Sequence, residues 1–103
     1  MNTTERLTKI EQLATKIEEH QIQRLKIEKL DCETNLKNAK TSVKLGNKYT
    51  RIDIGTSGAY MIDQDGNIFG IKAYGVIHRG HFFGTLDTIN QYNWGGYRAH
   101  KLK

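Results

Sequence analysis

Apolar residues recur with helical spacing through the first half of the chain. Between residues 4 and 44 they return mostly every three or four positions, and on a helical wheel they share one sector about 140° wide, the pattern of an amphipathic helix. The sector holds Leu7, Ile10, Leu13, Ala14, Ile17, Leu25, Cys32, Leu36, Ala39 and Val43. The pattern predicts one long helix over residues 4–44, with Gly46 as the left-handed stop behind it.

The apolar stripe is interrupted in its middle by His20, Gln21 and Arg24, and Ile27 and Leu30 fall outside it. A helix of about 40 residues is about 60 Å long, more than the remaining residues can cover. We therefore expect the helix to form a homo-oligomer as a coiled coil, or alternatively to dock on a target. Ile27 and Leu30 are candidates for contacts with the rest of the same chain.

The second half alternates apolar and polar positions with the period of a β-strand. Tyr49–Ile54 places Ile52 and Ile54 on one face, and strands are also expected at Ala59–Ile62 and Ile68–Tyr74. Between the last two lies Asp63-Gln64-Asp65-Gly66-Asn67, whose Asp-Gly pair is a strong signal for a hairpin turn. These strands predict an antiparallel sheet.

Composition divides the chain near Gly46. All nine aromatic residues and nine of the ten glycines follow that position. We expect an α+β fold in two parts. The first, residues 1–46, is a long amphipathic, coiled-coil-like oligomerisation helix, and the second, residues 47–103, is a small, compact, antiparallel β-domain. A domain of that size has a thin core, so support from the helix is expected.

Charge and cysteine content narrow the class of protein. Sixteen Lys and Arg against eleven Asp and Glu give a net charge of +5, and a single cysteine cannot form an internal disulfide. There is no run of apolar residues long enough for a membrane span. No basic-then-apolar leader opens the chain, so we expect neither secretion nor a membrane partner.

The segment around residues 75–87 carries the richest candidate chemistry. Arg79 offers a planar fork to a phosphate, His78 and His81 can donate hydrogen bonds, and Gly80 and Gly84 allow close approach of the backbone to a ligand. The set predicts an anion-binding site. The structural alternative is that the glycines serve bends and bulges while the polar residues point outward from a strand.

The same residues allow two other interpretations, a metal site and an enzyme active site. His78, His81, His100 and Asp87 could ligate zinc, but residues three apart on a strand point to opposite faces. Two histidines with Arg79 could form a metal-free nuclease site. We expect no metal ligands, no catalytic residues and no cofactor.

An aromatic and glycine-rich run occupies residues 92–98. Trp94 and Tyr97 are expected to close the core of the domain. The alternative is a stacking surface for bases, with Arg98 and His100 on phosphates, as in proteins that bind single-stranded nucleic acid. Arg98 joins the candidate ligand-binding residues on that ground.

Four stretches of the second half resemble small phage-encoded proteins of unassigned function. They are Lys48–Gly55, Gly75–His81, Gly84–Ile89 and Trp94–Tyr97, so the resemblance covers about residues 48–100. It brings no characterised activity and no catalytic residues. What it implies is a setting: a small accessory protein in the cytoplasm of an infected bacterial cell, where such proteins often counter host defences.

The function expected from these observations is non-enzymatic binding of a phosphate-bearing ligand, either a nucleotide signal or a nucleic acid. His78, Arg79, Gly80, His81, Gly84 and Arg98 are the expected binding residues. The alternative is a protein–protein inhibitor of a host defence nuclease such as a CRISPR effector, an anti-CRISPR role. A small metal-free nuclease is the third possibility.

Overall fold

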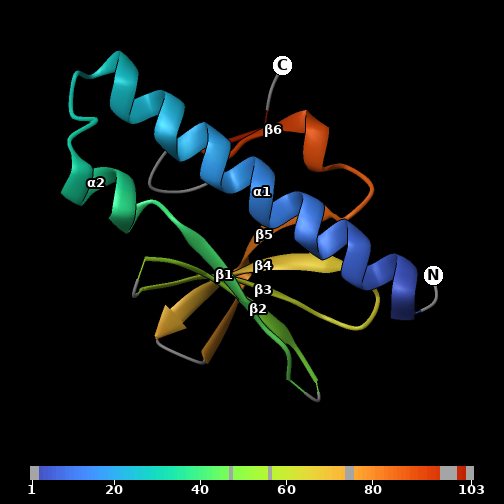
Figure 1. Cartoon of the computed structure of the whole chain (residues 1–103). Helices are drawn as coiled ribbons and strands as arrows, with labels where there is room; N and C mark the ends of the chain where they lie inside the picture. The colour runs from blue at the N-terminus through green and yellow to red at the C-terminus, as the bar shows by residue number, and fades with distance from the viewer. Residues whose placement is uncertain (1–2, 47, 56, 74–75, 96–99, 102–103) are drawn as a thin grey trace.

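The computed structural model describes residues 3–46, 48–55, 57–73, 76–95 and 100–101, with the backbone alone for residues 3, 72–73, 76–79 and 100. It shows a long N-terminal helix followed by an antiparallel sheet, the α+β class expected from the sequence (Figure 1). The elements are α1 (Thr3–Ile27), α2 (Glu33–Asn38), β1 (Thr41–Lys44), β2 (Thr50–Ile54), β3 (Ser57–Ile62), β4 (Asn67–Ala73), β5 (Val76–Thr85), a 3-10 turn at Ile89–Gln91, β6 (Tyr92–Asn93) and β7 (His100–Lys101).

The main sheet is a five-stranded meander in which neighbours in sequence are neighbours in space, in the order β1-β2-β3-β4-β5. The expected hairpin between β3 and β4 is confirmed. The Asp63 carboxylate accepts hydrogen bonds from the backbone N–H of Asp65 (3.0 Å) and of Asn67 (2.8 Å), and Gly66 has a φ of +86°. These are the local bonds by which Asp and Gly favour turns.

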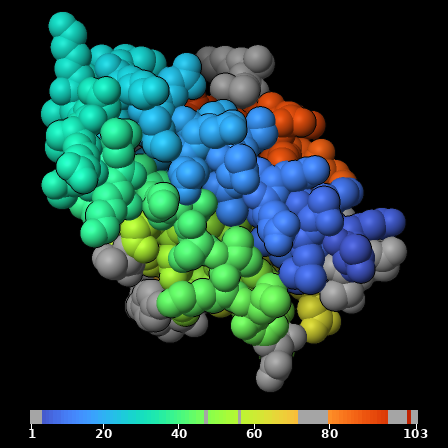
Figure 2. All heavy atoms as spheres, in the orientation of Figure 1, coloured from blue at the N-terminus to red at the C-terminus, as the bar shows by residue number. Residues whose placement is uncertain are grey.

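Helix α1 runs across one face of this sheet and buries its apolar stripe there. Ile10, Leu13 and Ile17 have no exposed surface and form one cluster with side chains of the sheet, among them Ile52 and Ile68. In the space-filling view, α1 and β1 largely hide the sheet behind them (Figure 2). The stripe is therefore covered by the chain's own sheet.

The expectation of one helix over residues 4–44 was wrong, because α1 ends at Ile27 in a Schellman motif. Lys29 takes a left-handed φ of 59°. Its N–H bonds to the carbonyl of Lys26 (3.2 Å), and the N–H of Leu30 bonds to the carbonyl of Leu25 (2.8 Å). These are the two closing bonds of that motif. The usual glycine signal is absent, since a lysine occupies the left-handed position.

The residues after this stop do not continue the helix. They form α2 and then β1, whose Val43 pairs with Ile52 of β2. The domain boundary expected at residue 46 thus falls inside the sheet, in the hairpin between β1 and β2. Ile27 and Leu30, which were expected to contact the rest of the chain, are not buried by it, since they are 73% and 51% exposed.

The shorter helix removes the reason for expecting an oligomer from the sequence. At 25 residues α1 is about 37 Å long, and its buried stripe faces the chain's own sheet. Oligomerisation itself stays a prediction. No helix in the described part of the chain is long and apolar enough to cross a membrane.

Polar contacts fasten α1 to the rest of the molecule at several places along its length, among them an ion pair between Lys9 and Asp87. Near the start, the Arg6 guanidinium donates to the carbonyl oxygens of Ile62 (3.1 Å) and Asp63 (2.7 Å). In the middle, a carboxylate oxygen of Glu18 accepts from the N–H of Thr41 (2.9 Å). A further contact binds the backbone around Trp94 to the helix, where the stripe is interrupted by polar residues.

Trp94 closes the core, as expected from the sequence. Its side chain has no exposed surface, and its ring meets the Tyr60 ring edge-on with centroids 5.2 Å apart. The indole Nε1 donates to the carbonyl of Ile89 (3.0 Å), so its polar atom is satisfied inside the core. The segment that carries Trp94 is thereby positioned against both the sheet and α1.

Candidate functional site

The segment that the sequence singled out lies at an irregularity of strand β5. Gly70 of β4 pairs with His78, while the adjacent Phe69 pairs with Phe82. Arg79, Gly80 and His81 therefore lie between two successive pairs and have no partner position on β4. Such bulges re-aim side chains and are frequent beside functional sites.

Gly70 gives the bulge room to fold over β4. A Cβ atom at this position would lie 3.0 Å from the Cβ of His81 and 3.3 Å from a ring carbon of Phe83. The rings of His81 and Phe83 lie side by side, with centroids 6.4 Å apart. The glycine on β4 thus lets the bulge of β5 place His81 above the sheet, on the side that faces α1.

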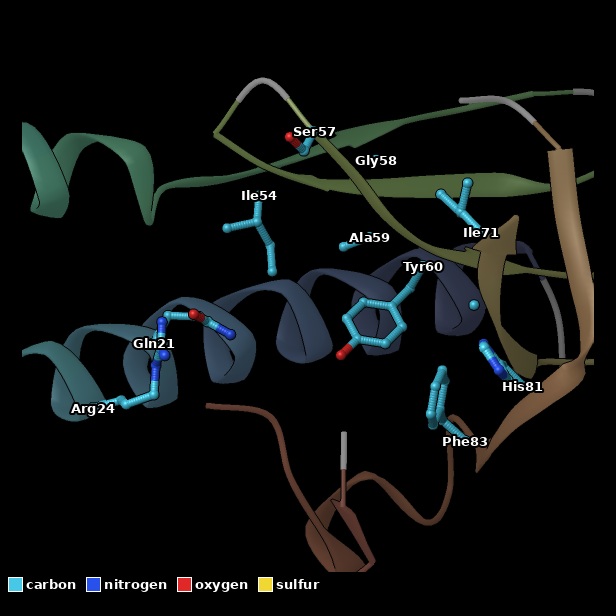
Figure 3. Close-up of a pocket in the computed structure, with 11 residues that line it drawn as sticks. Gln21, Arg24, Ile54, Ser57, Gly58, Ala59, Tyr60, Ile71, His81 and Phe83 are labelled. Atoms are coloured by element: carbon cyan, nitrogen blue, oxygen red, sulfur yellow. The ribbon is translucent and has the colours of Figure 1, made fainter. Parts of the chain in front are cut away.

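A cavity of about 470 Å³ opens between the C-terminal half of α1 and the sheet. Figure 3 shows Gln21 and Arg24 of α1 at one end, His81 and Phe83 of β5 at the other, and Tyr60 between them. The rest of the described lining consists of Ile54, Gly70, Ile71 and the segment Ser57–Ala59. The volume lies in the usual range for small-molecule sites, about 300–1,000 Å³.

The polar lining of the cavity favours an anion. Arg24 is cationic, His81 contributes an imidazole, and none of the described lining residues is acidic. The Arg24 guanidinium lies 3.9 Å from the carboxylate of Glu28, longer than a well-formed hydrogen bond, and its side chain is 44% exposed. Arg24 is therefore placed to exchange this weak surface pair for a ligand.

The α1 end of the cavity is fixed by bonds to the backbone of Trp94. The buried Gln21 donates from its amide nitrogen to the carbonyl of Trp94 (2.8 Å), and the Nδ1 atom of His20 accepts from its N–H (3.0 Å). Burial, followed by the nearby charge of Lys16, lowers the pKa of His20, while Glu19 opposes this shift. A neutral His20 is the form that accepts this bond.

The structure describes the position of some of the predicted site residues. His81 lines the cavity, and Gly80 is exposed in the bulge beside it. Gly84 is buried with a φ of +79°, and a Cβ there would lie 2.9 Å from the ring of Tyr92, so its conformation requires glycine. The side chains of His78 and Arg79, and the whole of Arg98, lie outside the described part of the structure.

Sequence reasoning missed the contribution of α1. Gln21 and Arg24 were noted as a break in the apolar stripe but were not assigned to a site. The break was the available signal, because polar residues at buried helix positions need partners. Among the described residues, no group of three or more His, Cys, Asp or Glu side chains is arranged to hold a metal ion.

Comparisons with protein-family models, with curated proteins and with solved structures find no match to this chain. The assignment of the site therefore rests on the cavity and its chemistry.

Proposed function

We propose that this protein binds a small phosphate-bearing ligand, a nucleotide, in the cavity between α1 and the sheet, without catalysing a reaction on it. The observation that carries the proposal is the cavity lining itself. A volume of about 470 Å³ is bounded by Arg24 and His81 at opposite ends and by no acidic residue among those described.

Different residues of the cavity lining suit the phosphate and the base of a nucleotide. Arg24 supplies the planar fork that suits phosphate oxygens. Ile54, Ile71 and Phe83 give apolar surface to a base, and the amide of Gln21 and the hydroxyl of Ser57 add hydrogen-bonding groups. Small-molecule sites commonly combine a mostly apolar wall with a few polar groups in this way.

The test is titration calorimetry with the four ribonucleoside monophosphates, the four nucleosides and inorganic phosphate. We expect a monophosphate to bind more tightly than its nucleoside, because the nucleoside lacks the group that Arg24 holds. Arg24→Ala should weaken binding about tenfold, near the lower limit for a charged hydrogen bond, since Arg24 is partly exposed. Arg24→Lys should recover part of this loss.

Lys26→Ala is the matched control. Lys26 is an exposed cation on the same helix and lines neither this cavity nor its neighbour. Arg79→Ala tests the residue that the sequence favoured. If Lys26→Ala weakens binding as much as Arg24→Ala does, the effect comes from net charge alone. If no monophosphate binds, the proposal is refuted.

The phage setting and a role against host defence stay predictions. A nucleotide-binding protein of this kind would fit the sequestering of a nucleotide signal, the first of the functions expected from the sequence. The protein–protein inhibitor and the metal-free nuclease remain the competing hypotheses. Nucleotide binding that is lost on Arg24→Ala would favour the nucleotide-binding function over both.

A further inference from the structure

A second cavity adjoins the first at the C-terminal end of α1. It measures about 390 Å³ and lies between the last two turns of the helix and the segment from Asn93 to Gly95. The residues that line it from the helix side are His20, Gln23, Arg24, Ile27 and, just past the end of α1, Glu28, whose carboxylate pairs with Arg24. The backbone approaches closely here, since a Cβ at Gly95 would lie 2.8 Å from the carbonyl oxygen of His20.

Among the residues that the structure describes, Arg24 lines both cavities. Helical geometry explains this position. Gln21, three residues before Arg24, lines the first cavity, and Ile27, three residues after it, lines the second, since residues three apart are neighbours along a helix surface. Arg24 therefore lies between two cavities, each of a size that suits a small ring system with its sugar.

We infer that the two cavities together bind one dinucleotide, with its bridging phosphate at Arg24 and one nucleoside in each cavity. The inference rests on the proposed function and names its ligand class. A single shared cation matches the single negative charge of a phosphodiester. Both cavities offer groups that can bond to base edges: Gln21 and Ser57 in the first, Gln23 and Asn93 in the second.

The comparison of a dinucleotide with a mononucleotide separates this inference from simple charge attraction. A monophosphate carries more negative charge than a phosphodiester, so charge alone favours the mononucleotide. Linking two nucleosides makes the second contact intramolecular, which raises affinity without new charge. We expect the best of ApA, CpC, GpG and UpU to bind at least about tenfold more tightly than its own monophosphate.

Variants of residues in the second cavity test whether this cavity holds the second nucleoside. Ile27→Asn should lower dinucleotide affinity to that of the monophosphate and leave the monophosphate unchanged, because a neutral side chain adds no carboxylate beside Arg24. Ile27 is 73% exposed, so the fold should tolerate this change. Leu30→Asn is the matched control, at an exposed apolar residue just beyond α1 that lines neither cavity. A methylphosphonate-linked dinucleotide, which is neutral at the bridge, should lose most of the gain.

The outcomes distinguish this inference from the proposed function. If a monophosphate binds and no dinucleotide binds more tightly, the two-cavity inference is overturned and the nucleotide site stands. The same holds if Ile27→Asn and Leu30→Asn have equal effects on the dinucleotide. If neither monophosphates nor dinucleotides bind in calorimetry, both are overturned.

Discussion

The Nδ1 atom of His20 accepts a hydrogen bond of 3.0 Å from the backbone N–H of Trp94, 74 residues later in the chain. This bond joins the polar break in the stripe of α1 to the segment that carries the core tryptophan. The bond also lies beside both cavities, because the adjacent Gln21 lines the first cavity and His20 the second.

The stability of the protein should fall as pH is lowered below about 6.5. The pKa of His20 is lowered in the folded state, mainly by burial, so the unfolded chain takes up the proton first. The contribution is therefore present above the unfolded pKa and is lost as pH falls through the folded one.

Urea unfolding of the protein and of His20→Gln between pH 7.5 and 5.0 measures this contribution. The variant has no titrating imidazole at position 20, so its free energy of unfolding should depend less steeply on pH. Identical pH dependence in the two proteins would show that the bond between His20 and Trp94 does not respond to protonation.

Ile17→Asp should unfold the protein as a single chain. Ile17 has no exposed surface and packs in the cluster that α1 forms with the sheet, so an unpaired carboxylate there should cost several kcal/mol. Thr15→Asp, at an exposed position of the same helix, should change stability by less than about 0.5 kcal/mol. Circular dichroism at several protein concentrations measures whether each variant is folded. If the Ile17→Asp protein stays folded as a monomer, the apolar stripe of α1 lies at an interface between chains instead.

Glu28→Gln should strengthen nucleotide binding. The carboxylate of Glu28 competes with a phosphate for the guanidinium of Arg24, from which it is 3.9 Å away. Surface pairs of this kind contribute up to about 1 kcal/mol, so the gain should be at most about fivefold. Calorimetry against the unsubstituted protein measures it, and weaker binding would argue that Glu28 positions Arg24 rather than competing for it.

Gly70→Ala should disturb the cavity from the sheet side. The added Cβ would press on His81 and Phe83, at 3.0 and 3.3 Å. Overpacking of this kind commonly costs about 1–3 kcal/mol. We expect a lower melting temperature and weaker nucleotide binding together. An unchanged affinity would mean that the position of His81 does not matter to the ligand.

The elements that the sequence predicted correctly are those with local signals. The Asp63–Asn67 turn is encoded by side chains that bond to their own backbone, and the alternation in Tyr49–Ile54 marks the strand that forms at Thr50–Ile54. Trp94 was expected in the core because a large aromatic ring in a small domain has few other places.

The elements that were missed depend on contacts between distant residues. The end of α1 at Lys29 carries no glycine, and Val43 keeps helical spacing with Ala39 although it pairs with Ile52 in the sheet. The cavity unites Arg24 with His81, and no periodicity relates the two. The histidine segment was found from its composition, whereas the helix side of the site required the fold.

The most direct test of the account is chemical-shift mapping by NMR, with isotope-labelled protein and the nucleotide that binds best in calorimetry. We predict that the largest backbone changes fall on Gln21 and Arg24, on Ser57–Tyr60 and around His81, the residues that line the first cavity. Changes confined to the exposed face of α1, around Glu11 and Thr15, or no changes at saturating nucleotide, would contradict the claim that this cavity is the binding site.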